Sequence, residues 1–468
     1  MNRPNRTDLA WIGAVAVAML ALIAPVLWNG FPLLQYDTGG YLARWYEGYL
    51  VPSRSTVFGI FLHLGEGLHF WPNVLVQSAL TVWIVYLVLR VFGLARPLRL
   101  AALVVLLSVF TGLPWLTSIL LTDIFAGLSV LALYLFIFRA DDLRQWERIA
   151  LFVLIAFSVA THSATLAVLL AVLVAAAVLG MLRRGAVVAR RLIGGLAAMA
   201  CGAIMLVAAN FALSGQMAWT PGGYAIVFAR MLQDGIVAQY LNDRCPDTHL
   251  KLCPYRNELP ETGDQFLWED GPFQDLGRFE GLDDEMREIV LNSLRGYPAR
   301  QIEAALKSTL KQLTMVATGT GVNNRVVHTY GIMGGYVQEE LKAMRAARQQ
   351  RGLLDFSAIN RLHVPVALVS MATMLLGFVN FFQKRRDELA LLAATVAVAT
   401  LTNASVCAIL SGPHDRYGAR IAWVSTFVVI VAAMRYLKSA RASPSEQPAD
   451  DRLPPPAPAF SRGLIRKN

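Results

Sequence analysis

Long apolar runs separated by short charged clusters constrain this chain more than any other feature. Many windows exceed the roughly 18 apolar residues that a helix needs to span a bilayer. Only 16% of the residues are charged and 56% are hydrophobic, whereas soluble domains carry about 25% charged residues. We therefore predict an all-α polytopic membrane protein with about ten transmembrane helices. The expected spans are residues 10–27, 72–92, 98–114, 117–138, 148–162, 164–182, 192–213, 362–382, 387–411 and 418–437.

Lysine and arginine residues gather in alternate loops between these spans, which is the asymmetry of cytoplasmic loops. This pattern predicts cytoplasmic N- and C-termini, and it accounts for much of the net charge of +10 without invoking nucleic acid. The first span is expected to be a retained helix, because no small-residue cleavage site follows it. The predicted inside segments are the basic N-terminus, 90–99, 139–148, 183–191, 384–387 and the C-terminal tail.

The stretch 148–182 leaves the topology open. It reads either as two spans or as one long span followed by a re-entrant piece. Losing one span would invert the orientation of everything downstream.

The predicted spans divide the chain into four parts. Residues 1–213 form an N-terminal transmembrane module whose first outside loop, 28–71, contains an apolar stretch typical of interfacial helices. Residues 214–361 form a small, mainly helical periplasmic segment, with helical patterning at 283–312 and 337–350. Residues 362–438 supply the C-terminal spans, and residues 439–468 form a proline-rich cytoplasmic tail typical of disorder.

The four cysteines separate by predicted topology. Cys201 and Cys407 fall within spans and are expected to pack there. Cys245 and Cys253 fall in the long outside segment, where an oxidising compartment favours a disulfide. A metal site that includes His249 is the alternative, although no fourth ligand is evident.

Asp37 follows the first predicted span by about ten residues, close to the membrane surface on the outer side. A carboxylate in this place could act as a general base towards an acceptor hydroxyl, or it could hold a divalent metal. The alternative is a structural turn, since the sequence Asp-Thr-Gly-Gly that begins at Asp37 suits one.

Two further polar residues fall at the same predicted face. Asp123 lies in an otherwise apolar segment, about two turns into the expected helix, where an ionisable group is costly and suggests function. Favourable interaction with a helix dipole, or pairing with an arginine, is the structural alternative. His162 occupies a predicted outer turn, as a neighbour of the site or as a hydrogen-bonding cap.

The last predicted span begins on the outer side with His414, Asp415, Arg416 and Tyr417, followed by Arg420. Arg416 and Arg420 are one helical turn apart and can face the same way. Two guanidiniums suit phosphate, which they bind through paired hydrogen bonds. Positive residues are normally depleted on this side of a membrane, so simple anchoring explains them less well.

These residues give the chain a resemblance to the GT-C superfamily of membrane glycosyltransferases, in the group of protein mannosyltransferases and lipid A aminoarabinose transferases. Asp37 matches the acidic residue of the first outside loop, the stretch 52–62 resembles the interfacial segment, and Asp123 is a looser match to a second acidic position. The run 415–417 resembles an Arg-Tyr pair near the last spans. The resemblance covers roughly 10–215 and the last spans, without the Asp-Glu pair of the mannosyltransferases or a clear Asp-X-Asp.

The resemblance implies transfer of a sugar from a polyprenyl-phosphate donor to a lipid or glycan acceptor at the periplasmic face of a bacterial inner membrane. Asp37 and Asp123 would be catalytic, and Arg54, Arg416 and Arg420 would bind the donor phosphate. Whether a divalent metal takes part stays open. A transporter or flippase is the alternative, with Asp123, His162 and Asp415 as an ion relay. A scaffold that binds a partner through residues 214–361 is a weaker alternative.

Overall fold

The computed structural model describes residues 5–48, 50, 52–182, 187–245, 250–322, 325–383 and 388–442. Helices dominate these residues, and their only strand-like feature is an isolated parallel bridge between Leu33 and Ile119. The all-α prediction is confirmed. The basic residues 183, 184 and 384–386, and most of the tail at 439–468, lie outside the described residues.

Every predicted span overlaps a helix. Within the described ranges, seven helices are long and apolar enough to cross a membrane, namely α1, α4, α9, α10, α19, α20 and α21. The helices α5 and α7 are apolar but shorter, and α8 has 17 residues. The bounds are α1 (Arg6–Asn29), α4 (Trp71–Val91), α5 (Pro97–Phe110), α7 (Asp123–Phe138), α8 (Gln145–Thr161), α9 (Ser163–Leu182), α10 (Ala189–Ser214), α19 (Ser357–Gln383), α20 (Glu388–Leu410) and α21 (Asp415–Ala442).

The ambiguous stretch 148–182 forms two helices. The extended backbone of His162 ends α8, and α9 begins at the next residue. Of these two helices, α9 is long and apolar enough to cross a membrane.

The expected span 117–138 is wrong at its start. Residues of a short helix, α6 (Leu113–Ser118), precede an irregular segment in which Leu120 N donates to Leu33 O at 2.9 Å. The helix α7 begins only at Asp123. Asp123 therefore lies in the first turn of its helix, not two turns inside it, where the helix dipole favours a negative charge.

The segment 30–70 between α1 and α4 contains two helices, α2 (Tyr36–Glu47) and α3 (Thr56–His63), which pack against each other. A left-handed glycine, Gly48, ends α2. Ser55 caps α3 by accepting a hydrogen bond from Phe58 N. These two helices hold the N-terminal part of the site against the bundle.

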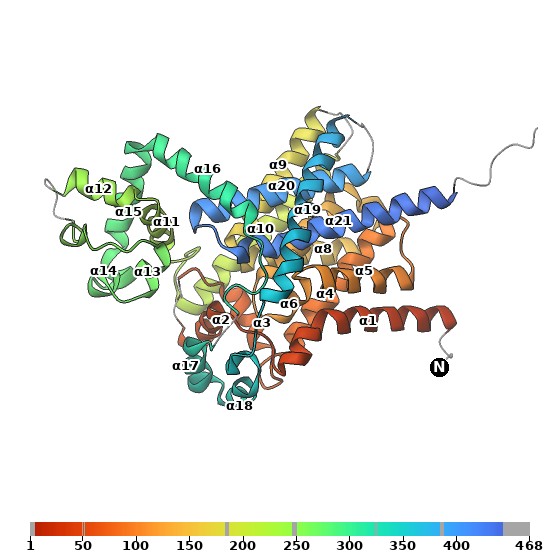
Figure 1. Ribbon diagram of the computed structural model, residues 1–468, viewed down its shortest axis with the longest axis horizontal. Helices are drawn as coiled ribbons and strands as arrows, with labels where there is room; N and C mark the ends of the chain where they lie inside the picture. The colour runs from red at the N-terminus through yellow and green to blue at the C-terminus, as the bar shows by residue number, and fades with distance from the viewer. Residues whose placement is uncertain are drawn as a thin grey trace, which may run out of the picture.

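The segment 214–361 is helical and divides into two groups (Figure 1). The lobe, α11 to α15, stands apart from the bundle on the left, and α16 runs from it to the bundle. The lobe has its own apolar core, which includes Phe228, Phe266 and Phe273. The helix α17 packs against α2. The bounds are α11 (Gly223–Gln233), α12 (Ile236–Arg244), α13 (Gly263–Trp268), α14 (Pro272–Asp275), α15 (Arg278–Gly296), α16 (Pro298–Thr314), α17 (Val327–Tyr336) and α18 (Gln338–Ala346).

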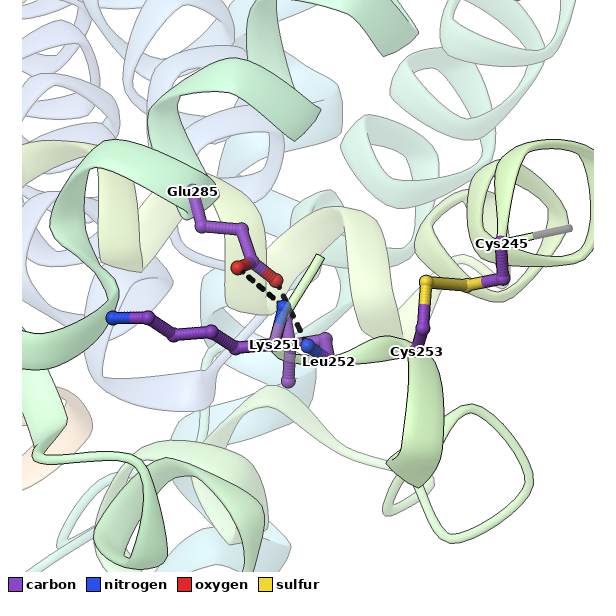
Figure 2. Close-up of a disulfide and its surroundings, with 5 residues drawn as sticks. All are labelled: Cys245, Lys251, Leu252, Cys253 and Glu285. Carbon is purple, nitrogen blue, oxygen red and sulfur yellow. Dashed lines mark hydrogen bonds between the residues drawn. A yellow bond between two sulfur atoms is a disulfide. The ribbon is translucent and has the colours of Figure 1, made fainter. Parts of the chain in front are cut away.

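Cys245 and Cys253 form a disulfide in the lobe (Figure 2). Beside it, Glu285 on α15 accepts hydrogen bonds from the backbone amides of Lys251 and Leu252, at 2.7 and 2.9 Å. The disulfide ties this loop to the end of α12, and the carboxylate ties it to α15. His249, the alternative metal ligand, lies outside the described residues.

The two remaining cysteines differ in exposure. Cys407 is buried as expected, whereas Cys201 is exposed on α10, so the packing role expected for it is wrong.

Close packing of α7 on α21 positions the site. A Cβ atom at Gly127 would lie 2.7 Å from Nε1 of Trp423, which is nearly fully buried. Only glycine allows this approach, so α7 and α21 pack closely within a few turns of Asp123 and Arg416.

Candidate functional site

One guanidinium joins two carboxylates at the centre of the candidate site. Arg416, in the first turn of α21, donates from Nη1 to Asp37 Oδ2 at 2.5 Å and from Nε to Asp123 Oδ2 at 2.7 Å. Asp37 belongs to α2 and Asp123 to α7. Three segments far apart in sequence therefore meet at one side chain. All three residues were singled out from the sequence.

Asp37 has a second arginine partner. Its Oδ1 accepts a hydrogen bond from Arg54 Nη2, so both carboxylate oxygens are bound by guanidinium groups. Gln35 caps α2 by accepting from the amide of Asp37 at 2.9 Å. A Cβ atom at Gly40 would lie 3.3 Å from the Arg54 side chain, so glycine lets the arginine lie close over the helix.

The two arginines set the charge of Asp37. Burial favours its neutral form, but Arg54 and Arg416 outweigh burial and lower the pKa from 3.8 to about 2. Asp37 is thus firmly ionised at neutral pH in this arrangement. A carboxylate held in this way is a weak proton acceptor.

Arg420 lies one turn further along α21 and is fully buried. Its Nη1 is 3.8 Å from Asp123 Oδ1, and it also donates to His162 Nε2 at 3.4 Å. Asp123 Oδ1 has no hydrogen-bond partner among the described residues, although it is buried. A buried carboxylate oxygen that accepts no hydrogen bond is a place where a ligand hydroxyl can donate.

Sequence reasoning missed the residue that fixes Arg420. Asn403 on α20 accepts from Arg420 Nε and Nη2 at 2.9 and 2.6 Å, and its own amide donates to Tyr417 O at 2.7 Å. Asn403 is buried within an apolar helix. The sequence signal that could have identified Asn403 is its position as a lone amide in an apolar run, because a buried polar group requires a hydrogen-bond partner.

The other three candidates near the start of α21 contact neighbouring residues, not the carboxylates of the central cluster. Asp415 Oδ1 accepts from the amide of Ala317 at 2.8 Å. Tyr417 shares a hydrogen bond with Ser411 at 3.0 Å. The ring of His414 packs edge-on against that of Tyr417. They shape the surroundings of the first turn of α21, which carries Arg416.

A mainly apolar pocket opens beside the charged cluster. Asp123 and Arg416 are the charged residues that line it, and apolar side chains such as Trp115, Leu121 and Phe356 line it as well. A cluster of charged side chains next to an apolar pocket suits an amphiphilic ligand whose phosphate is joined to a hydrocarbon chain.

The arrangement does not fit a divalent cation. Such a cation requires several free oxygen ligands, whereas both oxygens of Asp37 and one oxygen of Asp123 bind arginine. Across the described ranges, no group of three or more His, Cys, Asp or Glu residues is placed to hold a metal. We therefore assign no step to a metal.

Searches of protein-family models, curated proteins and solved structures find no match to this chain.

Proposed function

We propose that this protein is a membrane glycosyltransferase that moves a sugar from a polyprenyl-phosphate donor to an envelope acceptor. The observation that carries the proposal is the bridge from Arg416 to Asp37 and Asp123, two members of which, Arg416 and Asp123, line a mainly apolar pocket. The bridge gathers groups suited to phosphate binding and to proton transfer. The pocket offers a start for the hydrocarbon chain of the donor.

The charge of the cluster favours a phosphate. Three guanidiniums, on Arg54, Arg416 and Arg420, surround the two carboxylates of Asp37 and Asp123. One positive charge is left over, which matches the single negative charge of a phosphodiester such as polyprenyl-phosphate sugar. The surplus also stabilises the additional negative charge that develops on the phosphate as the sugar leaves.

The chemistry requires one proton acceptor. The oxygen of the acceptor hydroxyl attacks the anomeric carbon, and the bond from that carbon to the phosphate oxygen breaks. The hydroxyl proton passes to Asp37, and polyprenyl phosphate leaves with the bonding electron pair. Asp123 Oδ1, which accepts no hydrogen bond from the described residues, can orient the acceptor hydroxyl.

Donor binding and proton transfer are coupled in this scheme. The arginines that hold Asp37 ionised are the same arginines that would engage the donor phosphate. As they turn to the phosphate, their hold on Asp37 weakens and its pKa rises. Asp37 thus becomes an effective base when the donor is in place.

The location is part of the proposal. We propose a topology of ten spans with basic loops on the cytoplasmic side, in which Asp37, Asp123 and Arg416 lie at the periplasmic face of a bacterial inner membrane and both termini lie inside. The first outside loop then lies at the interface, and 214–361 lies in the periplasm.

The test is to follow the bond that the reaction breaks. Purified protein is mixed with the lipid extract of its own cells, and polyprenyl phosphate and its sugar conjugates are quantified by mass spectrometry. The proposal predicts protein-dependent loss of one conjugate and an equal gain of free polyprenyl phosphate. A transporter or flippase would leave the conjugate intact, and that result would refute the proposal.

A further inference from the structure

The helix α16 carries an exposed apolar stripe. Ile302, Leu306 and Leu310 follow one another at intervals of four residues, and they are 62%, 61% and 65% exposed. Residues four apart share one face of a helix. A stripe of three large apolar side chains facing water would be costly.

The opposite face of α16 is fixed to the bundle. Ser308, which lies across the helix from Leu306, is buried and accepts a hydrogen bond from Arg230. Arg230 also donates from Nε to the carbonyl of Ala408, on the last turn of α20, at 2.8 Å. The stripe therefore faces away from the protein.

The C-terminal end of α16 is also hydrogen-bonded to the bundle, near the same end of α20. Gln312 donates to the carbonyl of His414 and accepts from its amide, both at 2.9 Å. His414 lies in the connection between the end of α20 at Leu410 and the start of α21 at Asp415. Both of these helices are candidate membrane spans. The helix α16 is thus held at the boundary where two spans meet the membrane surface.

The neighbouring surface and the charges indicate what covers the stripe. Ile409 and Leu410 are exposed at this same end of α20, which continues the apolar surface. Arg300, Lys307 and Lys311 are exposed along α16. Glu303, paired with Lys307, is the only acidic residue on this helix. Lys and Arg beside an apolar face are typical of helices lying in the interface of an anionic bilayer.

We propose that α16 is a membrane-surface helix whose stripe of Ile302, Leu306 and Leu310 lies among the lipids of the leaflet on the side of the lobe. Arg300, Lys307 and Lys311 then face anionic headgroups. The helix connects the lobe to the bundle (Figure 1), so its insertion fixes the lobe at the lipid surface. The proposal is independent of the chemistry at Asp37.

The test measures whether lipid or water surrounds the stripe. The full-length variant Leu306→Cys in a Cys201→Ser background is spin-labelled and reconstituted in vesicles of phosphatidylcholine and phosphatidylglycerol at three to one. The disulfide stays oxidised, and Cys407 is buried. Collision with oxygen reports lipid, and collision with a water-soluble nickel chelate reports water. Glu288→Cys, at an exposed position on α15, is the matched control.

The proposal predicts that the ratio of oxygen to nickel accessibility at position 306 exceeds that at position 288 at least several-fold. Equal ratios would place the stripe in water and overturn the proposal. Low accessibility to both reagents would show a protein cover and would overturn it too. The thermal melting of each labelled variant checks that the fold is retained.

A second arm tests the headgroups. Adding Lys307→Gln and Lys311→Gln to the labelled variant should lower the ratio in vesicles with phosphatidylglycerol, but change it little in phosphatidylcholine alone. The same ratio in both lipids for the parental and the substituted helix would contradict the role of the lysines.

Discussion

Arg416 Nη1 and Asp37 Oδ2 lie 2.5 Å apart, although 379 positions separate the two residues in the chain. The same guanidinium binds Asp123 at 2.7 Å. The helix α2, the start of α7 and the start of α21 therefore share one electrostatic contact. Changes at this contact should affect donor binding, proton transfer and stability together.

Asp37→Asn should reduce sugar transfer by about 100-fold or more, because a positioned base contributes roughly 10²–10⁴ to the rate. The variant retains the shape of the side chain but cannot accept the proton. The initial rate of polyprenyl phosphate release by purified protein measures the effect.

The matched control is Glu147→Gln. Glu147 is also a buried acid paired with an arginine, Arg90, but it belongs to the start of α8. This variant should lose stability and keep its transfer rate once folded. A parental rate for Asp37→Asn would show that Asp37 is not the base.

Arg416→Lys should lower transfer by about tenfold to 100-fold. Lysine keeps the charge but cannot hold two carboxylates through fixed N–H groups. A hydrogen bond to a charged group contributes about 1.5–3 kcal/mol. The control is Arg90→Lys, which disrupts the bidentate ion pair with Glu147 and should leave the transfer rate unchanged. Parental activity in Arg416→Lys would argue against a bridging role.

The contribution of Asp37 to stability should depend on pH in one direction. Its pKa falls from 3.8 to about 2 on folding, so the stabilisation is complete above about pH 4 and is lost as the pH drops towards 2. The wild type should therefore exceed Asp37→Asn by about 2 kcal/mol at pH 7, at roughly 1.4 kcal/mol for each tenfold change in the proton equilibrium. Unfolding in detergent from pH 7 to pH 3 measures the difference, and a difference that shrinks between pH 7 and pH 5 would contradict the assignment.

Gly127→Ala should separate α7 from α21. The new methyl group would overlap Trp423, and overpacking in a core costs about 1–3 kcal/mol. Asp123 and Arg416 stand at the ends of these helices, so transfer should fall as well. Gly13→Ala on α1, where nothing lies within 4 Å, is the control and should be neutral. Thermal melting and transfer rates compare the two variants, and equal melting temperatures would refute the packing argument.

The sequence predicted the helical class and the positions of its apolar helices because long apolar runs have few alternatives. It also singled out Asp37, Asp123, Arg416 and Arg420, which stand out as charges beside apolar runs. It placed Asp123 too deep in its helix, because the bridge between Leu33 and Ile119 depends on a contact far along the chain. Asn403 was missed for a similar reason, since its importance depends on Arg420 being brought beside it.

The most direct measurement of the central claim is a comparison of envelope glycolipids and glycans by mass spectrometry. The cells compared lack the protein, or produce the wild type, Asp37→Asn or Glu147→Gln. The proposed function predicts that one sugar substituent is absent without the protein and with Asp37→Asn, and is restored by the wild type and by folded Glu147→Gln. Indistinguishable envelope profiles in all four strains would contradict it.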